Sequence, residues 1–205
     1  MRGTSTRRRV AALPPDERRA RLIEATLPLL RRYGPGISTR QIAEAAGVAE
    51  GTIFGAFRDK STLLRAAVEA AFDPDPVVRA LRAIDAGADL RARLVAAARI
   101  LMERVSDNAS LVAVCRTLAA TENAGDLMQR LSQARTRMLD AIATLVEPDR
   151  AALRRSPATV ARQLFLWTVF ATRHGALTED EPMDADEIVA LLLDGVLSRT
   201  GTGDT

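Results

Sequence analysis

The stretch between residues 37 and 60, ISTRQIAEAAGVAEGTIFGAFRDK, restricts the possible folds of this chain more than any other segment. Ser38 is followed three residues later by Gln41, which is the spacing of a capping box, in which each side chain bonds to the other residue's backbone N–H. Gly47 then supplies the left-handed residue that ends a short helix at little cost. The pattern therefore predicts a short, well-delimited helix between Ser38 and Gly47.

The spacing of small and aliphatic residues predicts how this helix meets the next one, over residues 50–57. Ala43 lies four residues before Gly47 and leaves room for a close crossing, while Val48 and Ile53 supply apolar anchors. This is the helix-turn-helix pattern, in which the second helix lies in the major groove of DNA. The alternative is an ordinary corner between two helices, because such residues also recur at these spacings by chance.

The same stretch resembles the tetracycline-repressor (TetR) family of transcriptional regulators, and the resemblance is specific over about residues 18–72. It rests on residues 39–43, 46–48, 51–54, 57 and 59–64, with a helix starting after Asp59 as its cap. The resemblance implies a homodimer that binds a pseudo-palindromic operator. It also implies that a small molecule entering the C-terminal domain releases the DNA.

The resemblance further implies which residues face the DNA. Thr39 and Arg40 would reach the DNA backbone and a base, and arginine can bridge O6 and N7 of guanine. Thr52, the N-terminal backbone of the second motif helix and Lys60 would bind phosphates. The full set expected at the DNA is Thr39, Arg40, Ala49, Glu50, Gly51, Thr52, Phe54, Gly55 and Lys60.

Several of these positions depart from the family's pattern. Ala49 stands where a serine or threonine cap is usual, and Phe54 and Ala56 stand where tyrosines often touch phosphate. Gly55 presents no side chain to a base, and Glu50 could either accept from cytosine or repel the DNA. The predicted recognition surface has fewer side chains able to contact DNA than is usual in the family, so Arg40 in the first motif helix should contribute more to binding.

Composition favours helices and excludes several classes of protein. Aromatic residues make up 3% of the 205 residues, whereas leucine, alanine and arginine dominate. No apolar run is long enough for a transmembrane helix, and no apolar core follows the basic N-terminus, so we expect neither a membrane span nor a secretory signal. Cys115, the only cysteine, cannot form an internal disulfide and fits a reducing cytoplasm.

Charge and helix breakers predict the domain organisation. Residues 1–72 hold 13 basic and 7 acidic residues, whereas the remainder holds 16 basic and 19 acidic ones, which suits an N-terminal part that binds phosphate. We expect a flexible basic arm over 1–13, a helix-turn-helix DNA-binding domain over 14–72, and a helical ligand-binding and dimerisation domain over 73–205. The acidic, proline-rich turn at 73–76 would form the boundary.

The C-terminal part reads as a series of helices, over 77–84, 89–106, 109–122, 126–146, 157–177 and 184–199. Residues 164–171, LFLWTVFA, are apolar on every side, so this segment must be covered all round. A second copy of the chain could provide that cover, and the alternative is a central buried helix in a monomer. The expected dimer interface comprises Leu164, Trp167, Ala171, Ile188, Leu191, Leu192 and Val196.

No catalytic, metal-binding or cofactor-binding constellation is present. His174 is the only histidine, and there is no glycine-rich phosphate loop. A small-molecule site would instead be an apolar cavity with one or two polar groups. We expect a mainly hydrophobic ligand to contact Met102, Val114, Leu118, Met138, Phe165, Phe170 and His174, although these residues could equally fill a solid core.

These observations predict an all-α, cytoplasmic, non-enzymatic regulator, a repressor, whose partners are double-stranded DNA, a second copy and a small molecule, with no membrane. The alternative is a nonspecific or architectural DNA-binding protein without a ligand switch. That protein would bind unrelated sequences equally, whereas a regulator has a large specificity ratio. A helical enzyme is disfavoured because the catalytic groups are missing.

Overall fold

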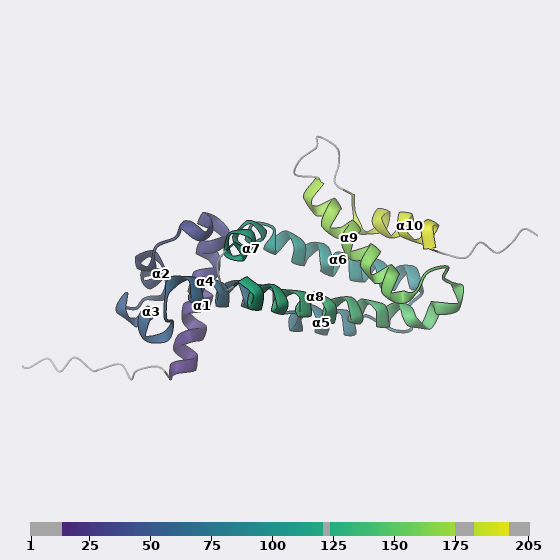
Figure 1. Ribbon diagram of the computed structural model, residues 1–205. Coiled ribbons are helices and arrows are strands. Elements are labelled where there is room, and N and C mark those ends of the chain that lie inside the picture. Colours follow the sequence, from purple (N-terminus) through teal and green to yellow (C-terminus); the bar gives the residue numbers. More distant parts are fainter. Residues whose placement is uncertain (1–13, 121–123, 175–182, 197–205) are drawn as a thin grey trace, which may run out of the picture. The chain divides into compact units, whose positions relative to one another are not determined.

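The computed structural model describes residues 14–120, 124–174 and 183–196, and every regular element among them is a helix (Figure 1). The all-α class that the sequence predicts is confirmed. The chain divides into two compact units, Met1–Val68 and Glu69–Thr205. This division lies slightly before the turn at residues 73–76, and the functional domain limits remain a prediction. The expected basic arm over residues 1–13 lies outside the described residues.

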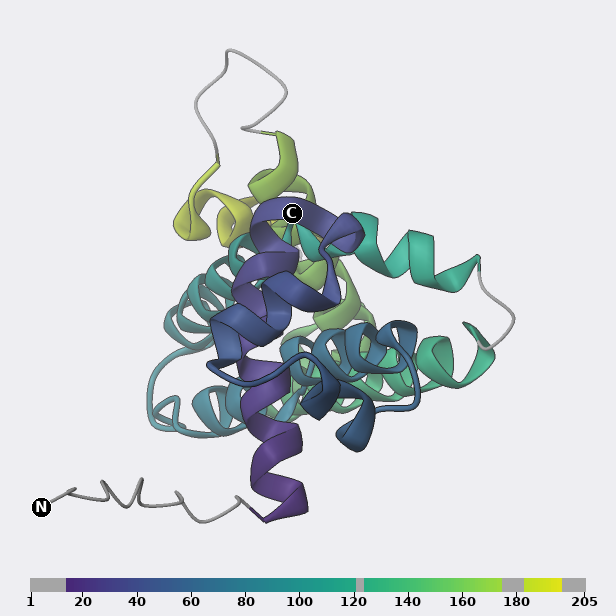
Figure 2. The ribbon, with the colours of Figure 1, turned by 90° about the vertical axis from the view of Figure 1, so that its left-hand side faces the viewer.

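From residue 14 onward, where it is described, the first unit is built from four helices and one short turn. They are α1 (Pro15–Tyr33), the 3-10 turn η1 (Gly34–Gly36), α2 (Thr39–Ala46), α3 (Gly51–Ala56) and α4 (Lys60–Ala71), of which α4 belongs to this unit as far as Val68. α1 packs against both α2 and α3, and Figure 2 shows it in purple running past them. The long first helix is therefore the support on which the two short helices rest.

Each helix of the first unit contributes apolar side chains to a shared core. Leu22, Leu30, Ile42, Ile53 and Leu63 are all exposed by 1% or less. Burying a side chain of this size contributes about 1.5–3 kcal/mol relative to leaving it in water. Because α2 and α3 are too short to be stable alone, their positions are set by this burial.

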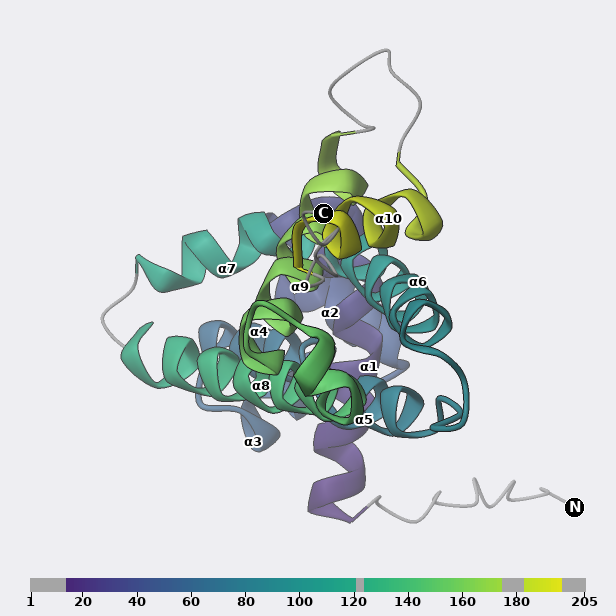
Figure 3. The ribbon, with the colours of Figure 1, turned by 90° about the vertical axis from the view of Figure 1, so that its right-hand side faces the viewer.

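The described residues of the second unit form six further helices. They are α5 (Asp75–Arg82), α6 (Leu90–Asn108), α7 (Leu111–Ala119), α8 (Ala124–Val146), α9 (Pro157–His174) and α10 (Ala185–Val196), with the 3-10 segment η2 (Glu147–Ala152) after α8. Where the chain is described, these limits agree with the sequence prediction to within a few residues. α9 packs against α6, α8 and α10, and Figure 3 shows it between α8 and α6.

Arg93 is a buried charge that connects α6 to the segment after α8. Its side chain donates hydrogen bonds to the backbone carbonyls of Leu145, at 3.0 Å, and of Ala88, and it forms an ion pair with Asp149 of η2. Arg93 is only 5% exposed. A buried charge is costly unless it is paired and hydrogen-bonded, and these three contacts meet that requirement.

α9 has an inward and an outward face, both of which are apolar. Leu164 and Ala171 point inward and are buried in the core of the same unit. Leu166, Trp167 and Phe170 point outward and are 63%, 40% and 48% exposed. One face of α9 is therefore open in the single chain, which disagrees with the alternative of a central helix buried within a monomer. Cover by a second copy remains a prediction.

The residues predicted for the dimer interface divide between these two environments. Four of the seven are buried in the core of their own chain, namely Leu164, Ala171, Ile188 and Leu192. Trp167 and Leu191 are exposed, and the side chain of Val196 lies outside the described part. Helical periodicity could not separate the two groups, because it finds an apolar face only when the opposite face is polar. The apolar character of the four buried residues needs no second copy to explain it.

Candidate nucleic-acid interface and internal cavity

α2 begins and ends as the sequence predicts. The hydroxyl of Ser38 accepts from the backbone N–H of Gln41 at 3.2 Å, and Gln41 Oε1 accepts from the backbone N–H of Ser38 at 2.8 Å, which completes a capping box. At the other end Gly47 adopts φ 65° and ψ 37°. The backbone N–H of Val48 then donates to the carbonyl of Ala43 at 3.0 Å. Only glycine takes this left-handed conformation at little cost, so the turn depends on it.

α3 is fixed by buried side chains on the side that faces the other helices. Ala43 of α2, Ile53 of α3 and Phe57, which directly follows α3, are 4%, 0% and 2% exposed. The N-cap residue of α3 is Glu50, one position after Ala49, and its side chain makes no capping hydrogen bond. The small residue, the left-handed glycine and the apolar anchor together form the helix-turn-helix that the sequence predicts.

Arg19 of α1 holds the C-terminal end of α3. Its guanidinium lies 4.1 Å from the centre of the Phe57 ring, and its Nη1 donates to the carbonyl of Ala56 at 2.5 Å. A cation at this position also opposes the negative end of the helix dipole. Arg19 is not among the residues predicted from the sequence. A signal for it was present, since Arg19 shares one helical face with the buried Leu22 and Thr26.

The residues predicted to face DNA lie on the solvent side of this unit. Arg40, Ala49, Glu50, Gly51, Phe54 and Gly55 are exposed, whereas Thr39, Thr52 and Lys60 are partly exposed. The Phe54 side chain is 54% exposed, which is unusual for a large apolar residue that serves only packing. The structure therefore leaves all nine residues within reach of a partner.

Two contacts within this surface involve acidic side chains. The hydroxyl of Thr39 donates to Glu50, which links the first turn of α2 to the start of α3. Arg40 Nε forms an ion pair with Glu44 at 3.0 Å, and both side chains are largely exposed. A surface pair of this kind contributes about 0–1 kcal/mol, so Arg40 can exchange Glu44 for another partner at small cost.

Asp59 caps α4 beside Lys60, as predicted. Its Oδ1 accepts from the backbone N–H of Thr62 at 2.7 Å and from the Thr62 hydroxyl at 2.8 Å. These bonds, the backbone one above all, lower the pKa of Asp59 to about 2 from its usual value of 3.8. The carboxylate is therefore ionised at neutral pH and fixes the turn that carries Lys60.

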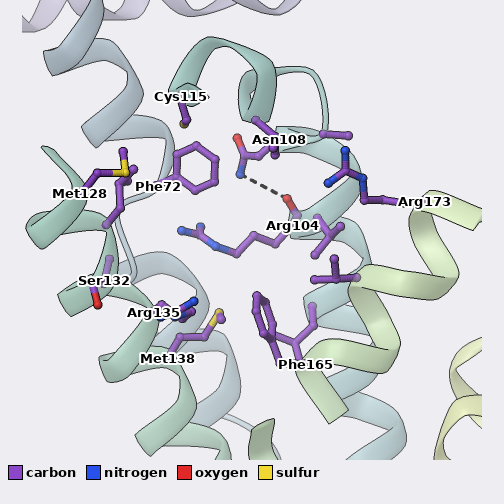
Figure 4. A pocket seen from close by; sticks show the side chains of 17 residues that line it. Phe72, Arg104, Asn108, Cys115, Met128, Ser132, Arg135, Met138, Phe165 and Arg173 are labelled. Carbon is purple, nitrogen blue, oxygen red and sulfur yellow. Dashed lines mark hydrogen bonds between the residues drawn. The ribbon is translucent and has the colours of Figure 1, made fainter. Parts of the chain in front are cut away.

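A cavity of about 490 Å³ lies inside the second unit (Figure 4). Small-molecule sites typically have volumes of about 300–1,000 Å³. Most of the wall is apolar and comes from Phe72, Leu101, Val105, Ala109, Val112, Cys115, Met128, Leu131, Ala134, Met138, Phe165 and Val169. The polar part consists of Arg104, Asn108, Ser132, Arg135 and Arg173.

Two of the seven residues predicted to contact a ligand, Met138 and Phe165, line this cavity. Met102, Val114 and Leu118 are not part of its wall. Phe170 lies on the outward face of α9, so it is not a wall residue of an internal cavity, contrary to the expectation. The side chain of His174 lies outside the described part. The sequence pattern identified the right helices but could not say which apolar positions fill the core.

The polar groups of the cavity were missed altogether. Arg104 and Asn108 lie one turn apart on α6 and share its cavity face with Leu101 and Val105, a helical spacing that could have revealed them. Arg104 Nη2 donates to the backbone carbonyl of Asp73 at 2.9 Å. Burial lowers the pKa of Arg104, but a guanidinium stays protonated at any physiological pH.

Other chemistry has little support in the described residues. No group of three or more His, Cys, Asp or Glu residues there is placed to hold a metal ion. Burial raises the pKa of the Cys115 thiol, so this side chain acts as a neutral part of the cavity wall. None of the described helices is both long and apolar enough to span a membrane.

The sequence of the first unit matches a family model. Residues 22–67, from the middle of α1 into α4, match the family described as bacterial regulatory proteins, tetR family. This range contains the helix-turn-helix and all nine residues predicted to face DNA. None of the curated proteins is significantly similar in sequence to this chain.

Solved structures share the fold over most of both chains. A protein assigned to the TetR family of transcriptional regulators from Mesorhizobium loti MAFF303099 has a TM-score of 0.70 at 20% identity, over 91% of this chain and 100% of that one. A TetR family transcription regulator from Marinobacter aquaeolei VT8 has a TM-score of 0.62 at 20% identity, over 90% and 97%. The fatty acid degradation regulator FadR from Bacillus halodurans has a TM-score of 0.60 at 15% identity, over 86% and 93%.

The family match covers the helix-turn-helix, and the structural similarity extends through the helical C-terminal part. Both agree with the resemblance that the sequence of residues 37–60 indicates. Residues 22–67 thus match the DNA-binding region of bacterial regulatory proteins of the tetR family, and the chain shares the all-α fold of solved TetR-family regulators.

Proposed function

We propose that this protein is a homodimeric repressor, which binds a palindromic operator and leaves it when a small molecule enters the cavity. The helix-turn-helix with its nine accessible residues is the observation that carries the proposal. Residues 14–72 would bind DNA, and residues 73–205 would bind the ligand and the second copy. As TetR-family regulators are generally non-enzymatic, we assign the chain no catalytic activity.

Readout of the operator would depend mainly on one arginine. Arg40 is exposed at the start of α2, and among the described residues it is paired with Glu44 alone, so its guanidinium can turn to the O6 and N7 atoms of a guanine. Thr52 and Lys60 would contact phosphates and set the register. Glu50 already accepts a hydrogen bond from Thr39, which gives this acidic residue a role in positioning α3 in addition to any contact with cytosine.

Dimerisation would use the exposed apolar residues and not the buried ones. We define the outer apolar patch as Leu166, Trp167 and Phe170 of α9 together with Leu191 of α10. The Trp167 and Phe170 rings pack edge to face with their centres 6.1 Å apart. Exposed aromatic residues that are grouped in this way mark interaction surfaces, and a second copy would bury them.

A ligand in the cavity would act by favouring one arrangement of the dimer over another. To convert a mostly DNA-binding population into a mostly released one, it must prefer the released arrangement by several kcal/mol. By thermodynamic linkage the operator must then weaken ligand binding by the same factor. The cavity lies in the second unit, so the effect on the first unit would be indirect.

Selection of bound sites from random DNA with the full-length protein tests the specific part of this proposal. We expect an enriched palindrome whose half-site centres are about 34–36 Å apart, or a multiple of that distance. Competition with unrelated DNA should show at least about a thousandfold preference for the enriched site. Equal affinity for all sequences would instead establish a nonspecific or architectural DNA-binding protein.

A further inference from the structure

The wall of the cavity carries an unbalanced positive charge. Among the described residues that line it, Arg104, Arg135 and Arg173 are basic and none is acidic. None of the three forms an ion pair with another residue in the described part of the chain. Residues 73–205 contain more acidic than basic residues, 19 against 16, so the composition of this part does not account for three arginines without an acid.

Arg104 is the most enclosed of these arginines. It is half-buried, whereas Arg135 and Arg173 are exposed at the cavity. Its Nη2 donates to the backbone carbonyl of Asp73 at 2.9 Å, and no other described residue accepts from its remaining N–H groups. Figure 4 shows the Arg104 side chain extending from α6 into the cavity. A guanidinium placed in this way offers donors to a ligand in a partly desolvated site, where charge-assisted hydrogen bonds are strong.

The rest of the wall favours an apolar partner. Phe72, Leu131, Met138 and Phe165 belong to the cavity and come from three different stretches of the chain, directly after α4, in α8 and in α9. A ligand without charge could fill this space but would leave the cationic side unpaired. A cationic ligand would be repelled by three arginines in a medium less polar than water. The wall therefore matches a molecule with an apolar body and a negative end.

We propose that the cavity binds an amphipathic anion, with a carboxylate or phosphate head on Arg104 and an apolar body against Phe72 and Phe165. Arg135 and Arg173 add to the positive potential around the head. This inference rests on the proposed function and gives the chemical class of its effector. It also changes the ligand predicted from the sequence, which was mainly hydrophobic, into one that must carry a negative charge.

Calorimetric titration of the full-length protein without DNA tests the proposal. Laurate, methyl laurate and dodecyltrimethylammonium have similar apolar chains, with negative, neutral and positive ends respectively. Laurate should bind at least about tenfold more tightly than methyl laurate, and the cation more weakly than either. Dodecyl phosphate serves as a fourth probe, and its affinity relative to laurate identifies which anionic head the site prefers.

Variants locate the effect in the cavity. Arg104→Gln should lose about tenfold in laurate affinity while binding methyl laurate as before, because only the charged head contacts this side chain. Arg91→Gln, which removes an exposed arginine from the same helix but outside the cavity wall, should leave both affinities unchanged. If Arg104→Gln does not fold, Arg135→Gln and Arg173→Gln at exposed positions should each reduce the preference for laurate over methyl laurate.

Equal affinities of the wild-type protein for laurate and methyl laurate would overturn the proposal, as would a lack of binding by every probe. An Arg104→Gln variant that lost both ligands alike would also contradict it. Because no DNA is present, failure here can be told apart from failure of the proposed function. A protein that selects a palindrome but shows no preference for anions keeps its function and loses only this assignment.

Discussion

The guanidinium of Arg19 lies 4.1 Å from the centre of the Phe57 ring, and through this contact the longest helix of the first unit holds the end of its shortest one. α3 has six residues and no side-chain cap, so it cannot be stable by itself. Its position is set by Ile53 and Phe57 in the core and by the hydrogen bond from Arg19 to Ala56. The orientation of α3, the helix predicted to enter the major groove, is thus set by contacts with the core and with α1.

Replacing Arg19 should weaken both the fold of the first unit and its binding to DNA. Arg19→Met keeps the length of the side chain but removes the cation and the donor, so we expect a loss of about 1–3 kcal/mol in stability. Arg19→Lys keeps the charge without the planar fork and should lose less. Thermal unfolding followed by circular dichroism measures the effect, and a melting temperature unchanged in Arg19→Met would show that the contact has no energetic role.

Replacing two glycines of the motif by alanine should change the stability of the protein in opposite directions. Gly47→Ala forces a side chain into the left-handed region, at φ 65°, and should destabilise the protein by about 1–2 kcal/mol. Gly55 lies within α3 with open space where a Cβ would stand, so Gly55→Ala should stabilise the helix by about 0.5–1 kcal/mol. Chemical denaturation of the two variants side by side tests both signs, and a stabilised Gly47→Ala would contradict the turn geometry.

The Arg40→Ala variant should lose about 1–3 kcal/mol of binding free energy on the selected operator. It should also show a weaker base preference at one base pair in each half-site. Lys60→Ala should instead weaken binding to all sequences alike and reduce the salt dependence. The matched control is Glu44→Ala, which frees Arg40 from its ion pair and should leave operator affinity intact or raise it. If Arg40→Ala weakened binding equally on every sequence, Arg40 would be a phosphate contact.

The sequence predicted the first unit well because its signals are local. Ser38 with Gln41, Gly47 and Asp59 each fix the backbone within a few residues, and each has the predicted partner or conformation. The contact of Arg19 with Ala56 spans 37 positions, and no local pattern carries such a pairing. Side-chain type and spacing show which face of a helix is apolar, but not what lies opposite it.

The second unit was harder to predict because one of its central helices, α9, is apolar on more than one side. In α9, Leu164 is buried in the chain's own core and Leu166, two residues later, is exposed to solvent. Composition cannot assign one of these leucines to the fold and the other to a partner. The cavity is hard to predict for a related reason. Arg104 is charged and so resembles a surface residue in the sequence, and only the packing of α6 against its neighbours places it in the cavity wall.

The outer apolar patch leads to the last prediction, which separates the two faces of α9. Leu166→Glu places a charge at a position that is 63% exposed, so it should disturb the single chain little but prevent a second copy from burying the patch. Leu164→Ala removes a side chain that is fully buried and should destabilise the fold by about 2–5 kcal/mol. The two substitutions are two residues apart and should have opposite consequences for assembly and for folding.

Light scattering at micromolar concentration gives the mass in each case. The wild-type protein and folded Leu164→Ala should have twice the chain mass of 22.1 kDa, whereas Leu166→Glu should have the mass of one chain. Because dimerisation stabilises the folded state by mass action, the melting temperature of the wild type should rise with protein concentration and that of Leu166→Glu should not. The monomeric variant should also bind a palindrome no more tightly than a single half-site, since it can no longer engage both halves at once. A Leu166→Glu protein that remained dimeric would place the interface on another surface of the molecule.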